Sequence, residues 1–179
     1  MQDSAAKVDS AERFHPETIA RAVEQPNIQT SAPVTFDQGS FKDPVGSVRV
    51  FADRVERTCR EKYVGAVKAF LSSALFRKLV DRGLLLNAQW DGQSATVQQP
   101  LIKNWSYHFE WSFSMLKDAA LTTLEIQREC LRAKMSLKDA AAYNLTFSQG
   151  RPIFVDLYSF EPFEPSLAWN GYDQFCREF

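Results

Sequence analysis

The chain has 179 residues and a mass of 20.4 kDa, with 21 basic and 22 acidic side chains. This length fits one domain, alone or with a tail, and allows a buried core without disulfides or metals. A net charge of −1 argues against the basic surfaces that bind nucleic acid or acidic membranes. No apolar run approaches the ~20 residues that span a bilayer, and the N-terminus lacks a secretory signal. We therefore expect a globular protein without nucleic-acid or membrane partners.

Residues 1–40 differ in composition from the rest of the chain. They contain six acidic and three basic residues, and Pro16, Pro26 and Pro33 interrupt their sparse apolar positions. Such a segment has too few apolar side chains to offset the entropy lost on folding. The sequence predicts a disordered tail over residues 1–40 and an ordered domain over residues 41–179.

The three cysteines, Cys59, Cys130 and Cys176, are odd in number and far apart. Their spacing matches neither a disulfide framework nor a zinc site. Thiols of this kind are typical of proteins in reducing compartments, so we expect a cytoplasmic protein.

The first half of the predicted domain combines short strands with a helix. Alternating valines around Ala52-Asp53 predict a β-hairpin. Residues 60–82 repeat apolar side chains at steps of three and four, which predicts one long amphipathic helix ended by Gly83. Residues 84–86 and 95–97 follow as two short predicted strands on either side of an Asp-Gly turn.

The second half begins with another long helix, predicted over residues 113–134 and capped by Ser112 or Ser114. Two strand-like runs, 143–147 and 152–156, then form the strongest hairpin pattern of the sequence. The predicted helix is expected to bury one stripe of side chains, interrupted by Gln127: Leu116, Ala119, Ala120, Thr123, Leu124 and Leu131. Together these elements predict an α+β domain with two long helices and a C-terminal β-hairpin.

One set of polar residues has the order expected of a catalytic site. Asp139 follows the second predicted helix, Asn144 comes five residues later at a strand start, and Asp156 ends the hairpin. This order resembles the catalytic half of protein-kinase-like phosphotransferases. By this resemblance Asp139 is the base that accepts the proton of the acceptor hydroxyl, and Asn144 and Asp156 are Mg²⁺ ligands. A Mg²⁺-bound nucleotide such as ATP is then the implied cofactor.

The sequence departs from the kinase pattern at several positions. Leu137-Lys138 replaces the usual His-Arg, and Leu157-Tyr158 follows Asp156 in place of Phe-Gly. No glycine-rich phosphate loop is present, since Gly46 stands alone in the first hairpin. The basic candidates for a nucleotide cleft are Arg57, Lys62 and Lys103, and the sequence does not choose among them. The resemblance therefore predicts a kinase-like fold with a reduced N-terminal lobe. The structural alternative is that the three polar residues only cap turns and bond backbone.

Three longer stretches carry a second resemblance. Residues 111–124, 135–144 and 152–162, followed by Trp169 and the run Gln174-Phe175-Cys176-Arg177, resemble a bacterial family usually labelled class I SAM-dependent methyltransferase. The resemblance covers roughly residues 44–179, the N-terminal part of that family's longer chains. It implies a downstream methyltransferase domain in the same polypeptide, and the end of the sequence looks like a truncation before that domain.

The seven glycines of the chain are scattered, and no strand leads into a Gly-x-Gly turn of the kind that binds SAM. SAM is therefore expected only with a downstream domain. The predicted function is an N-terminal module of a methyltransferase-like protein, with a Mg²⁺-nucleotide phosphotransferase site. The alternative is a non-catalytic substrate-binding or protein-interaction module, or a fragment without activity. The sequence identifies no small-molecule or protein substrate.

Overall fold

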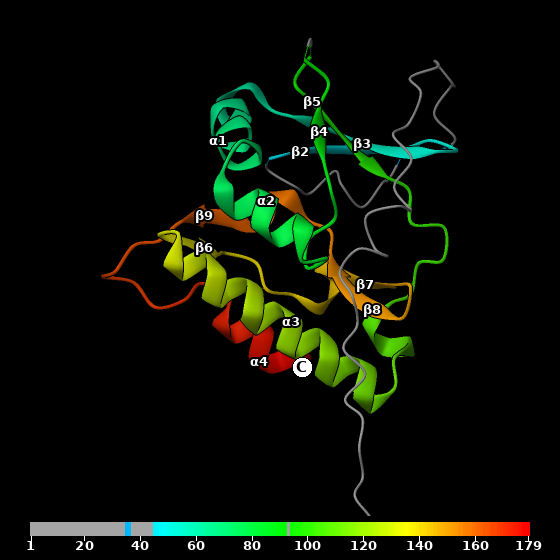
Figure 1. Ribbon diagram of the computed structural model, residues 1–179, viewed down its shortest axis with the longest axis vertical. Helices are drawn as coiled ribbons and strands as arrows, with labels where there is room; N and C mark the ends of the chain where they lie inside the picture. The colour runs from blue at the N-terminus through cyan, green and yellow to red at the C-terminus, as the bar shows by residue number, and fades with distance from the viewer. Residues whose placement is uncertain (1–34, 37–44, 93) are drawn as a thin grey trace, which may run out of the picture.

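The computed structural model describes residues 35–36, 45–92 and 94–179, which combine helices with antiparallel sheets (Figure 1). The predicted α+β class is confirmed at this level. The predicted tail, residues 1–40, lies outside the described residues except for Thr35–Phe36, which form the short strand β1. No helix among the described residues is long and apolar enough to cross a membrane.

A five-stranded antiparallel sheet forms the N-terminal part, in the order β1-β2-β3-β5-β4. The predicted first hairpin is confirmed as β2 and β3, with Val50 opposite Val55 next to the turn. The Asp-Gly turn is also confirmed, because Gly92 has a φ of 82° between β4 and β5. The strand bounds are β1 Thr35–Phe36, β2 Gly46–Val50, β3 Arg54–Cys59, β4 Gln89–Trp90 and β5 Thr96–Pro100.

The first predicted long helix is wrong in one respect, because the structure divides it into α1 (Glu61–Leu71) and α2 (Ala74–Asp81). The break lies at Ser73, whose side chain accepts a hydrogen bond from the Phe76 backbone amide at 3.0 Å. A serine with extended backbone in this position caps a new helix, so the apolar period continues while the backbone restarts.

Gly83 ends α2 as predicted. Its φ is 66°, its amide donates to the Val80 carbonyl, and the Leu84 amide donates to the Leu79 carbonyl, both at 2.9 Å. These two bonds form a Schellman motif, which needs the left-handed conformation that glycine adopts at low cost. The strand predicted over 84–86 is wrong, because the strand that precedes the Asp-Gly turn is β4, at Gln89–Trp90. Leu85 forms only an isolated parallel bridge with Phe154.

The long helix α3 (Phe113–Arg132) is confirmed, with Ser112 as its cap at 3.3 Å from the Met115 amide. Its buried stripe differs from the predicted one: Leu124 and Leu131 are exposed. The helix instead buries Ala119, Thr123, Ile126, Gln127, Glu129 and Cys130. Gln127 is buried because its amide bonds the Ser136 hydroxyl and the Leu137 amide, which satisfies the polar break in the apolar pattern.

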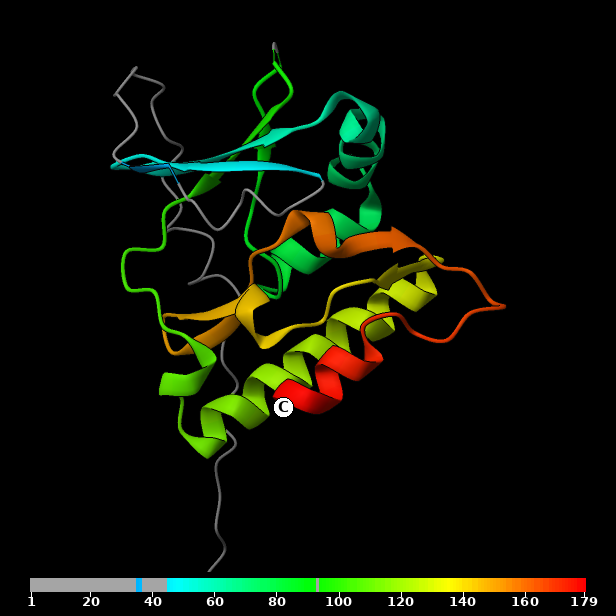
Figure 2. The same ribbon diagram turned by 180° about the vertical axis from the view of Figure 1, so that it is seen from behind.

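The C-terminal part packs short strands against α3 (Figure 2). The predicted hairpin is confirmed, and Gln149 and Gly150 both have positive φ in its turn, as in a type I′ turn. The sequence did not predict a second antiparallel pair, β6 and β9, or the helix α4. The bounds are β6 Met135–Leu137, β7 Leu145–Ser148, β8 Arg151–Phe154, β9 Phe160–Pro162 and α4 Tyr172–Glu178.

Three short 3-10 helices complete the described fold: η3 (His108–Glu110), η4 (Ala142–Asn144) and η5 (Leu157–Ser159). The core extends through both parts, and Phe154 on β8 lies in it without solvent exposure. The Phe154 amide donates to Leu84, and the Leu86 amide donates to Phe154. The hairpin is thereby fixed to the segment after α2, which places η4 and η5 close to the five-stranded sheet.

Candidate functional site

Asp156 lies at the start of η5, with both carboxylate oxygens engaged. Oδ1 accepts from Arg57 Nη1 at 3.2 Å and from the Tyr158 amide at 3.3 Å. Oδ2 accepts from the Ser159 hydroxyl at 2.6 Å. Arg57 is on β3, so this ion pair connects the five-stranded sheet to the C-terminal part, and both side chains are largely buried.

Asn144 lies at the end of η4 and approaches Asp156 through a shared partner. Its Nδ2 donates to the Ser159 hydroxyl at 3.3 Å, and the same hydroxyl donates to Asp156. The Val155 amide also donates to the Asn144 backbone carbonyl at 2.9 Å. The structure therefore brings together two of the three residues that the sequence singled out, although eleven residues separate them.

Asp139 has a different environment. It is half-buried, and its Oδ1 accepts from the Ala141 amide at 3.0 Å, which closes a turn two residues long. Within the part of the chain that the structure describes, no hydrogen bond or ion pair joins Asp139 to Asn144 or Asp156. The turn holds the loop in shape ahead of η4 but leaves Asp139 outside the bonded network.

Of the three basic candidates, Arg57 is the one that pairs with Asp156. Besides Asp156, Arg57 contacts Gln99 on β5, with Nε 2.6 Å from Oε1. The Gln99 amide in turn donates to the Val155 carbonyl at 3.1 Å. Lys62 instead lies over its neighbour Tyr63, and Lys103 is exposed.

Sequence reasoning missed Gln99 and Ser159 as members of this network. Gln99 occupies an inward position of β5, so its burial follows from strand alternation once the strand is known. Ser159 follows Asp156 by three residues, the spacing at which a hydroxyl reaches a turn-starting carboxylate. We name the five connected side chains the junction network: Arg57, Gln99, Asn144, Asp156 and Ser159.

The junction network contains two side chains with oxygens of the kind that bind Mg²⁺. Asp156 offers a carboxylate, and the Asn144 bond to Ser159 uses Nδ2, which leaves Oδ1 as the amide's acceptor. Mg²⁺ commonly takes one or two such protein ligands beside phosphate and water oxygens. A site made by protein alone is not supported, because no group of three or more His, Cys, Asp or Glu among the described residues could hold a metal ion.

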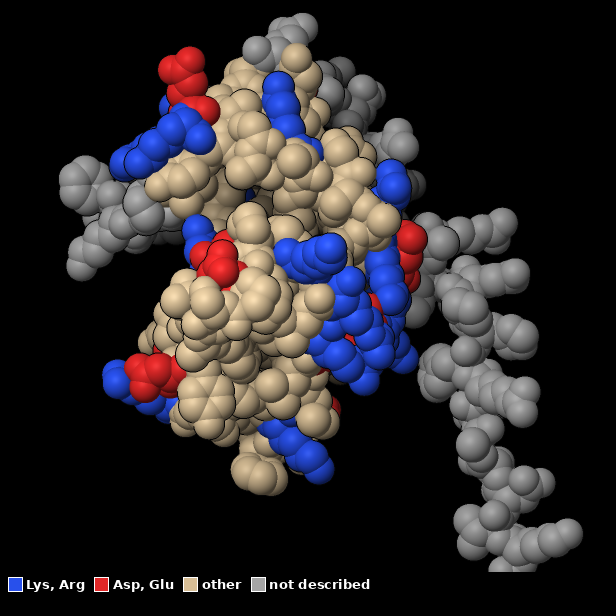
Figure 3. Space-filling model, turned by 90° about the vertical axis from the view of Figure 1, so that its left-hand side faces the viewer, with Lys and Arg blue, Asp and Glu red and all other residues tan. Residues whose placement is uncertain are grey.

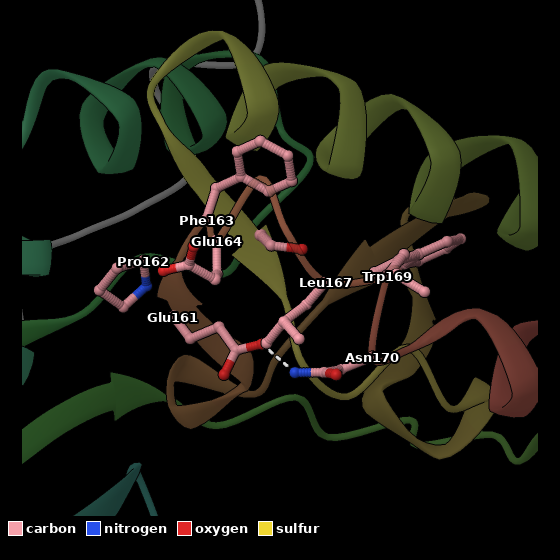
Figure 4. Close-up of a pocket in the computed structure, with 9 residues that line it drawn as sticks. Glu161, Pro162, Phe163, Glu164, Leu167, Trp169 and Asn170 are labelled. Atoms are coloured by element: carbon pink, nitrogen blue, oxygen red, sulfur yellow. Dashed lines mark hydrogen bonds between the residues drawn. The ribbon is translucent and has the colours of Figure 1, made fainter.

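A separate pocket lies between β6, β9 and the loop that leads to α4 (Figure 4). Its polar groups are already bonded, since Glu161 accepts from Asn170 at 2.7 Å and Glu164 accepts from Ser166 at 2.9 Å. The lining contains none of the junction network. These carboxylates of the pocket therefore require no ligand.

A second charged cluster lies between α2 and α3, where Lys and Arg side chains gather on one face (Figure 3). We name it the Glu129 cluster. Its buried member, Glu129, pairs with Lys78 at 2.6 Å, Arg132 at 2.8 Å and Arg82 at 3.4 Å. The hydrogen bond from Lys78 and the nearby cations lower the pKa of the Glu129 carboxyl, against the opposing effect of desolvation. Glu125 accepts from Arg82 and Arg128 beside it.

Comparison with known proteins finds a relative that is longer than this chain. The chain is 38% identical over 151 residues to nodulation protein NoeA of Rhizobium meliloti (strain 1021), a match that covers 79% of the chain. The matched part is 31% of NoeA, so the chain spans about a third of the length of this relative. No protein-family model matches the chain.

Proposed function

We propose that the chain is the N-terminal module of a longer SAM-dependent methyltransferase-like protein and that its junction network binds a Mg²⁺-nucleotide. The observation that carries this proposal is the convergence of Asn144 and Asp156 on Ser159, next to the Arg57 guanidinium. Asn144 is linked to Asp156 through the Ser159 hydroxyl, and Asp156 contacts Arg57 directly. A carboxylate, an amide oxygen and a guanidinium are groups that bind a metal and its polyphosphate.

The order of elements supports the finer part of the proposal, a kinase-like fold. The five strands of the antiparallel sheet come first in the sequence, with α1 and α2 between β3 and β4. The long helix α3 follows the sheet. A loop with Asp139, a hairpin and an Asp then come in the order of kinase-like phosphotransferases. The basic residue on β3, Arg57, pairs with the Asp after the hairpin, so a guanidinium lies beside the proposed metal ligand.

In this proposal each residue has a separate role. Asn144 and Asp156 would hold Mg²⁺, which would neutralise charge on the phosphates. Arg57 would then pair with phosphate oxygens in place of Asp156, since a guanidinium is geometrically suited to them. Asp139 accepts the proton of the acceptor hydroxyl as that oxygen bonds to phosphorus and the nucleoside diphosphate leaves. The SAM site and the methylated substrate belong to the part of the longer protein outside this chain, and the proposal places the protein in the cytoplasm.

The second candidate is a non-catalytic binding or interaction module, and one observation favours it. Asp156 bonds three groups of the chain itself, so the carboxylate is satisfied without a metal. In that case the junction network is a structural clamp between the sheet and the hairpin. A module of this kind would bind the substrate of the longer protein or another protein.

A thermal-shift titration of the 179-residue chain with Mg²⁺-ATP, Mg²⁺-GTP and SAM, each alone, separates the two candidates. A nucleotide at 100 times its dissociation constant adds about 2.7 kcal/mol of stability, which is readily measured. We expect a shift with a Mg²⁺-nucleotide and none with SAM. The shift should be lost in Asn144→Ala, which removes a metal ligand but keeps the Arg57–Asp156 pair.

Ser166→Ala is the matched control, because Ser166 is exposed and its hydroxyl bonds Glu164, away from the junction network. The absence of any nucleotide shift in the wild-type chain, or an undiminished shift in Asn144→Ala, would overturn the nucleotide site and favour the structural clamp. If a shift is seen, Asp139→Asn should keep it while abolishing phosphoryl transfer. Retained turnover in that variant would remove Asp139 from its role as base.

A further inference from the structure

Apolar side chains line an exposed face of α3 that no described element covers. Phe113 is 82% exposed, Leu121 54%, Leu124 42% and Leu131 43%. Phe113, Leu124 and Leu131 are eleven and seven residues apart, which places them on one side of a helix, with Leu121 one turn from Leu124. We name these four side chains the α3 stripe.

The opposite side of α3 is already used by the fold. Ala119, Ile126 and Cys130 are fully buried there, and the helix packs against β6 and β8. Glu125 and Glu129 pair with Arg82 and Lys78 of the α2 segment. α4 runs beside α3 in both ribbon views (Figures 1 and 2). The α3 stripe therefore faces away from the core as a second apolar face of the helix.

The dimensions of the α3 stripe favour a tethered partner over a second copy of the chain. From Phe113 to Leu131 the helix rises about 27 Å and is about 10 Å wide, so the stripe offers roughly 300 Å². A stable dimer needs about 800 Å² from each partner. A small apolar contact can still be occupied when both sides belong to one polypeptide, because the effective concentration is then in the millimolar range.

We infer that the α3 stripe is the docking surface for the region of the longer protein that lies outside this chain. The inference rests on the part of the proposed function that makes the chain a module of a longer protein. The relative NoeA supports it, because about two thirds of its length lies outside the match. The docking segment should present an apolar face, with an acidic side chain that meets Lys117, which is exposed on α3 between Phe113 and Leu121.

Photo-cross-linking tests the inference in a chimera in which this chain replaces the matched third of NoeA. A benzophenone amino acid at Leu124 should cross-link to the NoeA-derived remainder, within one polypeptide. The same group at Phe109, which is exposed on η3 before α3 begins, is the control and should give at most a tenth of that yield. Leu121→Glu should lower the yield from position 124 at least tenfold.

Three other outcomes of the cross-linking experiment would overturn the inference. A product of twice the mass means that a second copy occupies the stripe, and a cross-link to residues 1–34 means that the chain's own N-terminus does. Equal yields at Leu124 and Phe109 mean that nothing docks specifically. None of these results depends on the junction network, so a failed nucleotide titration and a failed cross-link are independent.

Discussion

The junction network and the Glu129 cluster both hold the N-terminal part of the molecule to the C-terminal part, but they bury charge differently. In the junction network both ions of the pair are largely buried, with the Arg57 side chain 14% and the Asp156 side chain 18% exposed. In the Glu129 cluster the carboxylate is 4% exposed, whereas its cations are 38 to 61% exposed. A lost carboxylate therefore leaves a buried charge in the first case and cations that water can reach in the second.

Asp156→Ala should have the largest effect on stability of any single substitution at the two clusters. It leaves the Arg57 guanidinium buried without its carboxylate, which typically costs about 3 kcal/mol of unfolding free energy. Urea denaturation of the variant should show a lower midpoint at unchanged slope. The control is Asp53→Ala, because Asp53 also pairs with an arginine but is 46% exposed, so its loss should cost about 0.5 kcal/mol.

Replacing both members of the pair tests whether the loss comes from the unpaired charge. Arg57→Met with Asp156→Ala should be more stable than the sum of the two single effects predicts, because no charge remains buried. Additive losses would show that Arg57 and Asp156 contribute separately. The junction network would then not be an energetic unit, and its contrast with the Glu129 cluster would disappear.

The five-stranded sheet is tightly packed at Gly46, the single glycine of the β2–β3 hairpin. A Cβ at Gly46 would overlap the Thr58 carbonyl oxygen and come within 3.3 Å of the Tyr158 ring. Gly46→Ala should therefore cost about 2 kcal/mol, measured by the same denaturation. Gly65→Ala on α1 is the matched control, since nothing lies within 4 Å of its Cβ. It should stabilise the chain by about 0.5–1 kcal/mol because alanine favours the helix.

Glu129 is expected to make stability depend on acid pH. Its pKa is lowered in the folded chain, chiefly by the hydrogen bond from Lys78, relative to the unfolded value of 4.5. The stabilisation is thus complete above pH 4.5 and is lost as pH falls through the lower, folded pKa. Melting temperatures measured from pH 7 to pH 3 should fall more steeply in wild type than in Glu129→Gln.

At pH 7 the Glu129→Gln variant should melt below wild type, but with a smaller loss than Asp156→Ala. The reason is that Lys78, Arg82 and Arg132 regain water when the carboxylate is removed. Parallel pH profiles for wild type and Glu129→Gln would contradict the assignment. A loss at pH 7 equal to that of Asp156→Ala would contradict the contrast between the two clusters.

Local signals explain which parts of the molecule were predictable. Alternating valines, the Asp-Gly turn and the serine before α3 each act within a few residues, and the elements they predict are present. The break at Ser73 was missed because the apolar period continues through it. The buried face of α3 was misjudged because burial of Gln127 and Glu129 depends on partners on other elements.

The site was predictable to a similar extent. The spacing in the sequence predicted Asn144 and Asp156, and in the fold both side chains hydrogen-bond to the Ser159 hydroxyl. Spacing alone could not choose Arg57, because its distance from Asp156 is set by the packing of β3 against the hairpin. Whether Asp139, Asn144 and Asp156 act in phosphoryl transfer stays a prediction.

The smallest expected effect is on the alkylation rates of the cysteines, which report local opening of the fold. Burial raises the pKa of the Cys130 thiol to about 12, so it has almost no thiolate at neutral pH, while Cys176 is exposed. Alkylation of the native chain at pH 8 should modify Cys176 first and Cys130 only after opening of α3. Because Cys130 follows Glu129 on the helix, Glu129→Gln should speed its modification more than Asp53→Ala does, as followed by mass spectrometry. Equal rates at Cys130 in Glu129→Gln and Asp53→Ala would mean that α3 is not held by the Glu129 cluster.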